Sequence, residues 1–259
     1  MENSELLSCY KSILPLRHND KLLNASICIS KSPLDLLRIK TSIFLHPKEQ
    51  AYFNTLQYPK RQHSYLLGRY CAKQAISSYM QNECMTSSWI ESGVFHQPIV
   101  YSSFPSDVQV SISHTNSLGA AIAFPEQHPM GIDVEIIERK HLDAIRSQLT
   151  AAEQQMATLF AVDESLFLTL IWTIKEAIAK ALKCGFTIPF EILEVGEIRG
   201  REGVYEWESS FKLFQQFKAR SFVLDQAICT LVFPKGTDLH LDIAAIAPIV
   251  CGNRSGDRT

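Results

Sequence analysis

The chain repeats a short residue pattern, and this repeat restricts the possible folds more than any other feature. Residues 45–50 (Leu-His-Pro-Lys-Glu-Gln) resemble residues 149–154 (Leu-Thr-Ala-Ala-Glu-Gln). An apolar helical stretch with an Ala-Lys pair follows each copy, at Lys73 and at Lys180, and a turn containing Gly and Pro comes next. Because two repeats are too few for a solenoid, we expect two similar α+β halves related by a pseudo-twofold axis, with ligands in the crevice between them.

The length and composition indicate a folded protein rather than a disordered or membrane-spanning one. The 259 residues are 46% hydrophobic and 20% charged, and they contain no apolar run of membrane-spanning length. The seven cysteines form no CxxC pair, and the first residues do not resemble a signal peptide. We expect a cytoplasmic, monomeric protein with an N-terminal half over 1–127, a C-terminal half over 128–250 and a flexible tail over 251–259.

The charge balance limits the classes of partner. There are 25 basic and 27 acidic residues, giving a net charge of −2, and no long block of basic residues occurs. Proteins that bind nucleic acid or anionic membranes without specificity need a strongly basic surface. We therefore predict neither a nucleic acid nor a membrane as partner, and any anionic ligand should be small and held by a few placed cations.

Alternating apolar residues predict strands in the middle of the chain. Residues 108–112 alternate as in a strand, turn residues follow, and residues 120–124 resume as a second strand, so His114 should lie at the bend of a hairpin. In residues 132–136, Asp133 and Glu135 alternate with apolar residues. Because strand side chains change face at every step, both carboxylates should project from the side opposite the core.

A long amphipathic helix is predicted over residues 164–184. Its apolar stripe follows helical spacing, Gly185 is a natural terminator, and Trp172, Glu176 and Lys180 form a separate row four residues apart. The stripe comprises Phe167, Leu170, Ile171, Ile174, Ile178, Ala181 and Leu182. Upstream, Thr150 and Glu153 have the spacing of a capping box, which gives Glu153 a structural role rather than a catalytic one.

Several of these polar residues could carry chemistry, although each has an ordinary alternative. Three carboxylates, from Asp133, Glu135 and Glu176, are the oxygen donors that Mg²⁺ prefers, whereas an isolated pair on a strand is usually just a solvated face. Glu176 and Lys180 could equally be a surface ion pair, and His114 an ordinary turn residue. The basic residues Lys60, Arg61, Arg69 and Lys175 could simply be solvated. Taken together, the set fits a phosphorylated ligand, with carboxylates for a metal and cations for phosphates.

Two motifs resemble a known family. Residues 131–135 (Gly-Ile-Asp-Val-Glu) and 172–180 (Trp-Thr-Ile-Lys-Glu-Ala-Ile-Ala-Lys) resemble the G-[IV]-D-[IVL]-E and W-[ST]-x-K-E-[AS]-x-x-K signatures of Sfp-type 4′-phosphopantetheinyl transferases. Shorter segments are also similar to motifs of this family: Leu67-Gly68-Arg69, Ser113-His114-Thr115, 149–153 and 185–189. The resemblance covers residues 42–195 and implies the two-half architecture that the repeat suggests independently.

The resemblance also implies a reaction and roles for the residues that match the motifs. The family moves 4′-phosphopantetheine from coenzyme A to a serine of an apo acyl or peptidyl carrier protein and releases 3′,5′-adenosine bisphosphate. It implies that Asp133, Glu135 and Glu176 bind Mg²⁺, with Mn²⁺ as the alternative, and that Glu176 is the general base. Asp133 and Lys180 complete the expected catalytic set. The residues expected to contact coenzyme A are Lys60, Arg61, Arg69, Ser113, His114, Lys175 and Lys180.

One departure from the family pattern keeps two other functions open. The usual G-[KR]-P segment is His96-Gln97-Pro98 here, which removes a cation expected near the coenzyme A phosphates. A noncatalytic protein that binds carrier proteins or coenzyme A is therefore one alternative. A metal-dependent hydrolase of nucleotides or pyrophosphates is the other, because the same carboxylates could activate water.

Overall fold

The computed structural model of this protein describes residues 7–140, 142–160, 162–200 and 205–251. They form two antiparallel five-stranded sheets and a separate two-stranded hairpin. The first sheet has the order β12-β1-β2-β6-β5, from Thr237–Leu239, Cys9–His18, Lys21–Ser30, Gly119–Pro125 and Val108–His114. The second sheet has the order β7-β11-β10-β9-β8, from Gly131–Ile136, Ala227–Pro234, Phe217–Leu224, Glu206–Phe211 and Val195–Gly200. The hairpin joins β3 (Ser88–Ser92) to β4 (Pro98–Ser102).

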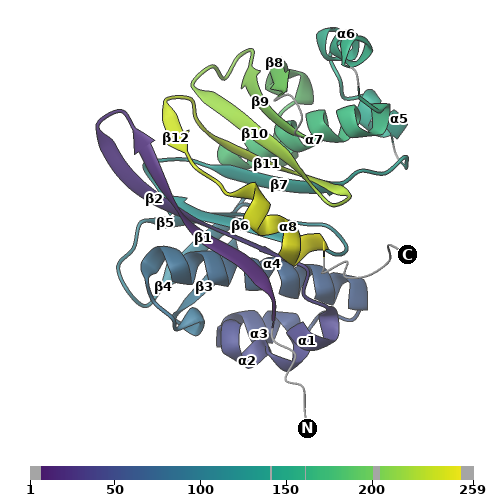
Figure 1. The fold of residues 1–259 in the computed structure, drawn as a ribbon. Coiled ribbons are helices and arrows are strands. Elements are labelled where there is room, and N and C mark those ends of the chain that lie inside the picture. The colour runs from purple at the N-terminus through teal and green to yellow at the C-terminus, as the bar shows by residue number, and fades with distance from the viewer. Residues whose placement is uncertain (1–6, 141, 161, 201–204, 252–259) are drawn as a thin grey trace, which may run out of the picture.

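One long helix covers the outer face of each sheet, so the molecule has four layers (Figure 1). Helix α4 (Pro59–Met80) packs on β2, β5 and β6, and α7 (Glu164–Ala181) packs on β7 and β11. The remaining helices are short: α1 (Leu34–Ile39), α2 (Thr41–Phe44), α3 (Pro47–Phe53), α5 (Leu142–Arg146), α6 (Ala151–Leu159) and α8 (Ile243–Cys251). Three 3₁₀ turns complete the described elements: η1 (Met85–Ser87), η2 (Gly185–Thr187) and η3 (Phe190–Leu193).

The two halves repeat one strand order, which confirms the prediction of two similar α+β halves. In the N-terminal half the strand before the helices, β2, pairs with the last strand, β6, and β6 pairs with β5. In the C-terminal half β7 pairs with the last strand, β11, and β11 pairs with β10. A strand, a long helix and returning antiparallel strands therefore recur in each half.

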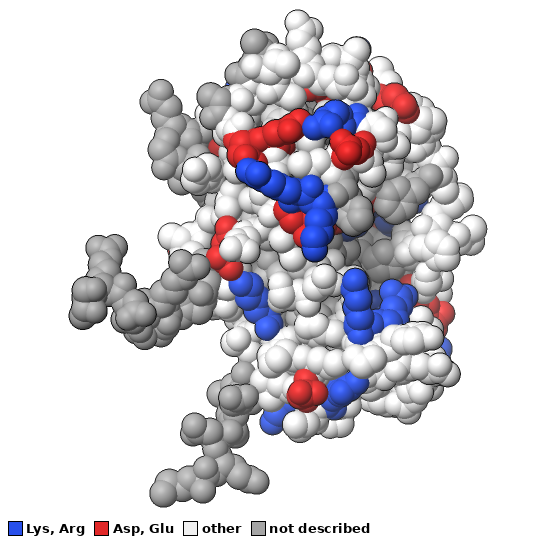
Figure 2. Space-filling model, turned by 90° about the vertical axis from the view of Figure 1, so that its right-hand side faces the viewer, with Lys and Arg blue, Asp and Glu red and all other residues white. Residues whose placement is uncertain are grey.

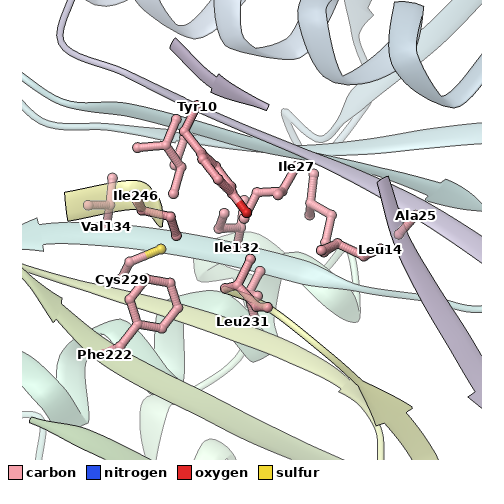
Figure 3. Packing of buried hydrophobic residues seen from close by; sticks show 14 of the residues in the cluster. Tyr10, Leu14, Ala25, Ile27, Ile132, Val134, Phe222, Cys229, Leu231 and Ile246 are labelled. Atoms are coloured by element: carbon pink, nitrogen blue, oxygen red, sulfur yellow. The ribbon is translucent and has the colours of Figure 1, made fainter. Parts of the chain in front are cut away.

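The core between the halves is made by the inner faces of the two sheets. Ile27 from β2, Ile132 from β7 and Leu231 from β11 are fully buried there, and Figure 3 shows their side chains meeting between the strands. Two further apolar clusters lie under α4 and under α7. Burying a large apolar side chain contributes about 1.5–3 kcal/mol, so this shared core holds the halves in a fixed relation.

The edges of the two sheets meet at β5 and β7 through serine hydroxyls. Ser111 Oγ accepts a hydrogen bond from Ile132 N at 3.1 Å, and Ser113 Oγ accepts one from Val134 N at 3.2 Å. The predicted hairpin is confirmed as β5 and β6, with His114 opposite Gly119 at its end. The serines place the end of this hairpin beside the acidic strand β7.

The C-terminal segment corrects the predicted domain boundary. Strand β12 pairs with β1 in the first sheet, and α8 contacts β1 and β2 as well as β10. Residues 237–250 therefore do not belong to the C-terminal half alone, as the division at residue 128 assumed. Of the predicted tail over 251–259, residues 252–259 lie outside the described residues.

The end of α7 also differs from the prediction. The helix ends at Ala181, and Lys183 adopts the left-handed conformation with φ of 55°, so Gly185 is not the terminator. Cys184 N donates to Ala179 O at 3.1 Å, which is the closing bond of a Schellman motif. Helix α4 ends in the same way, with Gln81 left-handed at φ of 51° and Asn82 N donating to Ser77 O. No described helix is both long and apolar enough to cross a membrane.

Candidate active site

A cleft of about 1120 Å³ lies where the two halves meet. The N-terminal half contributes α3, α4, the β3–β4 hairpin and the end of β5, and the C-terminal half contributes β7 and α7. Eight of the ten predicted site residues line it: Arg61, Arg69, Ser113, His114, Asp133, Glu135, Glu176 and Lys180. The predicted crevice between the halves is therefore present, and its use as a ligand site stays a prediction.

The close approach of β7 to α7 brings the acidic motifs together. A Cβ atom added at Gly131 would lie 2.0 Å from the carbonyl oxygen of Ala177 and 2.9 Å from the nitrogen of Ala181. Only glycine allows this contact, because both clashing atoms are backbone. Ile132 and Val134 face the shared core, so the alternating Asp133 and Glu135 face the cleft, as the strand pattern predicts.

Asp133 is buried at the centre of the cleft wall. The residue is 2% exposed, and its Oδ1 atom accepts hydrogen bonds from Ser113 Oγ at 2.8 Å and from Lys180 Nζ at 2.7 Å. Among the described residues, neither Asp133 Oδ2 nor Glu176 Oε1 has a hydrogen-bond partner, although both atoms are buried. Buried carboxylate oxygens normally have partners, so these two are candidates for contact with a bound cation or ligand.

Glu135 and Glu176 have raised pKa values. Burial, followed by the charge of Asp133, raises the pKa of each carboxyl to about 7, and Lys180 opposes the shift. Such shifts arise when like charges share a poorly solvated site. Each carboxyl is therefore poised to exchange a proton near neutral pH, which suits a general base.

The three carboxylates fit a cation, although they are not arranged as a closed metal site. Within the described ranges, no group of three or more His, Cys, Asp or Glu side chains is close enough to hold a metal ion. The Lys180 ammonium contacts Asp133 instead. Two unpartnered buried oxygens and two raised pKa values nevertheless mark an excess of negative charge, and hard oxygen donors of this kind suit Mg²⁺.

The N-terminal wall supplies positive charge and aromatic rings. Lys48 Nζ lies 4.4 Å from the centroid of the Trp89 ring and 3.3 Å from Glu91 Oε1. The Trp89 ring stacks with those of His46 and Tyr101, at centroid distances of 4.8 and 5.4 Å. These stacked rings and the nearby cations could hold a base and phosphates of a nucleotide.

His114 lies at the exposed end of β5, in the cleft. Loss of hydration beside the cleft walls, followed by the positive charges of Lys180 and Arg61, lowers the pKa of His114 below its ordinary value. The imidazole is thus mainly neutral at pH 7, and it can contact a phosphate as a hydrogen-bond donor rather than as a cation.

Two predicted ligand residues lie outside the cleft. Lys175 is 1% exposed, and its Nζ atom donates to Glu153 Oε2 at 2.7 Å and to Gln148 O at 3.2 Å, so the prediction that it contacts phosphates is wrong. Lys60 is exposed at the start of α4 and is not part of the cleft wall, although the adjacent Arg61 is. The motif gave the residue types but not the helix face on which each side chain lies.

Sequence reasoning missed several residues of the N-terminal wall. The cleft is also lined by Lys48, Tyr52, Tyr65, Trp89, Glu91, Ser92 and His96. Lys48 lies within the repeated segment, so the repeat was a usable signal for it, whereas the others come from separate stretches without a shared motif. Gln97 is folded onto its own turn, where its Oε1 atom accepts a hydrogen bond from Phe95 N at 2.9 Å.

A second cavity adjoins the acidic end of the cleft. It has a volume of about 850 Å³ and shares Glu135 and Trp172 with the cleft. Half of its other lining residues are apolar, and most of them come from the segment around α5 and from residues 187–191, where Phe190 stacks on Trp172 at a centroid distance of 5.1 Å. Beyond the carboxylates the site therefore continues into a cavity with a mixed apolar and polar lining.

One protein-family model matches part of the chain. Residues 129–232 match the family model of the 4′-phosphopantetheinyl transferase superfamily. The match covers less than half of the chain, so over this segment the chain is similar to that superfamily. The segment includes β7 and α7, which carry the four acidic and basic residues of the C-terminal cleft wall. The Sfp-type subfamily remains a prediction.

Solved structures show partial likeness, and no curated protein matches the chain. A holo-(acyl-carrier-protein) synthase from Bacillus anthracis in complex with CoA (3′,5′-ADP) is 18% identical, covers 44% of this chain and 97% of its own, and has a TM-score of 0.35. A holo-ACP synthase from Plasmodium yoelii is 18% identical, covers 46% and 96%, and has a TM-score of 0.32. A holo-[acyl-carrier-protein] synthase from Thermotoga maritima is 16% identical, covers 50% and 79%, and also has a TM-score of 0.32.

Proposed function

We propose that this protein transfers 4′-phosphopantetheine from coenzyme A to a serine hydroxyl of an apo carrier protein. One observation carries the proposal. Residues 129–232, which match the family model, place the acidic residues Asp133, Glu135 and Glu176 in the cleft, and Arg61, Arg69 and His114 of the N-terminal half line the same cleft. The site thus offers cations for the nucleotide phosphates next to carboxylates for a cation and for proton transfer.

The bonds made and broken follow from the chemistry of the pyrophosphate. The serine oxygen attacks the phosphorus that carries pantetheine, the bond to the bridging oxygen breaks, and 3′,5′-adenosine bisphosphate leaves. The serine proton passes to Glu176, whose raised pKa makes it an effective acceptor near neutral pH. Little covalent chemistry is required of the protein, so alignment and charge stabilisation supply the acceleration.

The residues of the cleft divide the remaining tasks. Arg61, Arg69 and neutral His114 bind the nucleotide phosphates, and Lys180, beside Asp133, contacts the pyrophosphate as its charge changes. Asp133, Glu135 and Glu176 would hold Mg²⁺, which when bound neutralises charge on the phosphate oxygens. The cavity beside Trp172 receives the pantetheine arm, because it continues the cleft beyond the carboxylates.

Mixed surface charge agrees with a carrier protein and a small anion as partners. On the face drawn in Figure 2, Lys and Arg side chains lie next to Asp and Glu side chains, and much of the surface is uncharged. A broad basic field, as nucleic acid binding requires, is absent from the described residues of this face. The arginines that the proposal assigns to phosphates, Arg61 and Arg69, line the cleft.

The test is to incubate the purified protein with coenzyme A, Mg²⁺ and an apo carrier protein and to measure the mass of the carrier. A phosphopantetheine adduct on the carrier serine is the expected result. Cleavage of coenzyme A without an adduct would favour a hydrolase, and no reaction with either substrate would favour a binding protein. Either of these results contradicts the proposed transfer.

A further inference from the structure

Each half contains one buried glutamate–lysine ion pair, built in the same way. In the N-terminal half Glu49 Oε2 lies 2.9 Å from Lys73 Nζ, and in the C-terminal half Glu153 Oε2 lies 2.7 Å from Lys175 Nζ. No side chain of the two pairs is more than 2% exposed. The structural partner of Lys73 is therefore Lys175, not the Lys180 that the sequence repeat suggested.

Both glutamates make the same backbone contacts. Glu49 accepts hydrogen bonds from His46 N and Ile90 N, each at 3.0 Å. Glu153 accepts them from Thr150 N at 2.8 Å and from Val195 N at 2.9 Å. Each glutamate thereby connects its capping box to a long helix through the lysine and to the next strand through a backbone hydrogen bond. This confirms the structural role predicted for Glu153.

The two pairs differ in one respect, which is an arginine that faces the cleft. Arg69, one helical turn before Lys73, lies with its Nε atom 3.4 Å from Glu49 Oε1, and its Nη2 atom donates to Ile90 O at 3.2 Å. Its guanidinium also lies 5.0 Å from the centroid of the Tyr65 ring. No arginine is an ion-pair partner of Glu153 within the described residues.

These contacts hold Arg69 in one place. The carboxylate, the Ile90 carbonyl and the Tyr65 ring contact the guanidinium from three elements, while the side chain, 18% exposed, still lines the cleft. Arg69 Nε is buried and makes no hydrogen bond to any described residue, even though Glu49 is near. A guanidinium fixed in advance loses less conformational freedom when it binds a phosphate than a free one does.

We propose that Glu49 is a positioning residue that holds Arg69 toward a phosphate group of the ligand. The Glu49 side chain is only 2% exposed and acts through the arginine, with Lys73 balancing its charge. This inference rests on the proposed function only in naming the ligand, because any phosphate in the cleft would meet the same guanidinium. The buried pair of the C-terminal half, which lacks such an arginine, provides an internal control.

The test measures binding of adenosine 3′,5′-bisphosphate by calorimetry in Glu49→Gln and Glu153→Gln. Both changes keep the size of the side chain and remove one buried charge. Glu49→Gln is expected to weaken binding about tenfold, because a charge-assisted contact to the arginine is lost. Both variants are expected to lower the melting temperature by a similar amount, because each breaks one buried ion pair. In Glu153→Gln, however, the affinity for the bisphosphate should stay within about twofold of the wild-type value.

A double variant separates positioning from a general effect on folding. If Glu49 acts through Arg69, then Glu49→Gln combined with Arg69→Gln binds the bisphosphate no more weakly than Arg69→Gln alone. Three results would each overturn the proposal. The first is that the losses of affinity in the two single variants add in the double variant, and the second is that Glu49→Gln and Glu153→Gln lose equal affinity. The third is that the wild-type protein does not bind the bisphosphate. Should Glu49→Gln fail to fold, Glu49→Asp keeps the charge but withdraws the carboxylate from Arg69, and the same weakening is expected.

The proposed function and the positioning role can fail separately. Bisphosphate binding requires no carrier protein and no transfer, so the titrations decide the role of Glu49 even if transfer is not observed. In the transfer assay, Glu49→Gln should raise the KM for coenzyme A while kcat remains near the wild-type value. A fall in kcat with unchanged KM would contradict a role confined to phosphate binding.

Discussion

The two halves share a strand order, a long helix and a buried glutamate–lysine pair, yet they present different side chains to the cleft between them. The N-terminal half contributes Arg61 and Arg69, whereas the C-terminal half contributes the three carboxylates Asp133, Glu135 and Glu176 and one cation, Lys180. The side chains of both glutamate–lysine pairs are buried, whereas the charged side chains that differ between the halves line the cleft. One scaffold can therefore carry two kinds of chemistry, because packing fixes the backbone and the cleft side chains remain free to differ.

The largest expected effect comes from Glu176→Gln, which removes the proposed base from the C-terminal wall. We expect kcat to fall by about 10²–10⁴, the usual contribution of general base catalysis, while the protein stays folded. The matched control is Glu164→Gln on the same helix, because Glu164 is 59% exposed and pairs with Arg146 outside the cleft. Equal activity in the two variants would remove Glu176 from the mechanism.

Gly131→Ala tests whether the acidic wall depends on close packing of β7 against α7. The added methyl group would meet the Ala177 carbonyl oxygen at 2.0 Å, so strand and helix must separate. We expect a loss of about 1–3 kcal/mol in the free energy of unfolding, measured with urea, and a fall in transfer activity. Gly236→Ala is the control, since its methyl group would approach side-chain atoms alone, those of His18 at 3.3 Å and of Asn19 at 3.8 Å.

The neighbours Lys60 and Arg61 test the N-terminal wall, because only Arg61 lines the cleft. We expect Arg61→Gln to weaken coenzyme A binding about tenfold, which is the effect of losing one charge-assisted phosphate contact. Lys60→Gln removes the same charge one residue away and should change the affinity by less than about twofold. Calorimetric titration measures both, and a larger effect of Lys60→Gln would show that the cation was assigned to the wrong residue.

Stability should depend on pH in a direction set by the raised pKa values. The pKa of Glu176 is about 7 in the folded protein and near 4.5 as its ordinary value, so the folded state binds more protons between these pH values. Stability from this group is therefore highest at low pH and is lost as pH rises through about 7. Glu176→Gln should stabilise the protein by about 1–3 kcal/mol at pH 8 and hardly at pH 4.

Transfer activity should show the opposite trend over the same range, because the base must be ionised. We expect activity to rise as pH increases through about 7, where Glu135 and Glu176 lose their protons in the free protein. Bound Mg²⁺ would favour the ionised carboxylates and shift this rise to lower pH. An activity that falls as pH increases from 6 to 8 would contradict the assignment of a carboxylate base.

The smallest effect concerns the junction of the two sheets. Ser111→Ala removes the hydroxyl that accepts from Ile132 N, and we expect a loss of about 1 kcal/mol in the free energy of unfolding with little change in activity. Ser113→Ala removes the equivalent contact to Val134 and also the bond to Asp133, so it should reduce activity as well. Equal activity losses in the two variants would show that the Asp133 contact adds nothing to catalysis.

The sequence predicted the parts of the fold that depend on local periodicity. The alternation around Asp133 fixed the face of both carboxylates, and the spacing of Trp172, Glu176 and Lys180 placed all three on the cleft side of α7. These predictions held because strand and helix periods are set by backbone geometry. The capping box at Thr150 and Glu153 was likewise predictable from neighbouring residues.

The errors arose where position depends on contacts between distant segments. Lys175 lies beside Glu176 in the sequence, but a step of one residue turns it about 100° around the helix, and there it meets Glu153. The pairing of β12 with β1 joins residues 237–239 to residues 16–18, and no local pattern indicates it. Trp89 and Lys48 meet in the same way, across two separate elements.

A crystal structure with coenzyme A and Mg²⁺ bound would test the central claim most directly, namely that both halves act on one ligand. We predict nucleotide phosphates against Arg61, Arg69 and His114, a metal ion among Asp133, Glu135 and Glu176, and the pantetheine arm directed toward Trp172. Coenzyme A bound by one half alone, or phosphates placed far from the three carboxylates, would contradict the account.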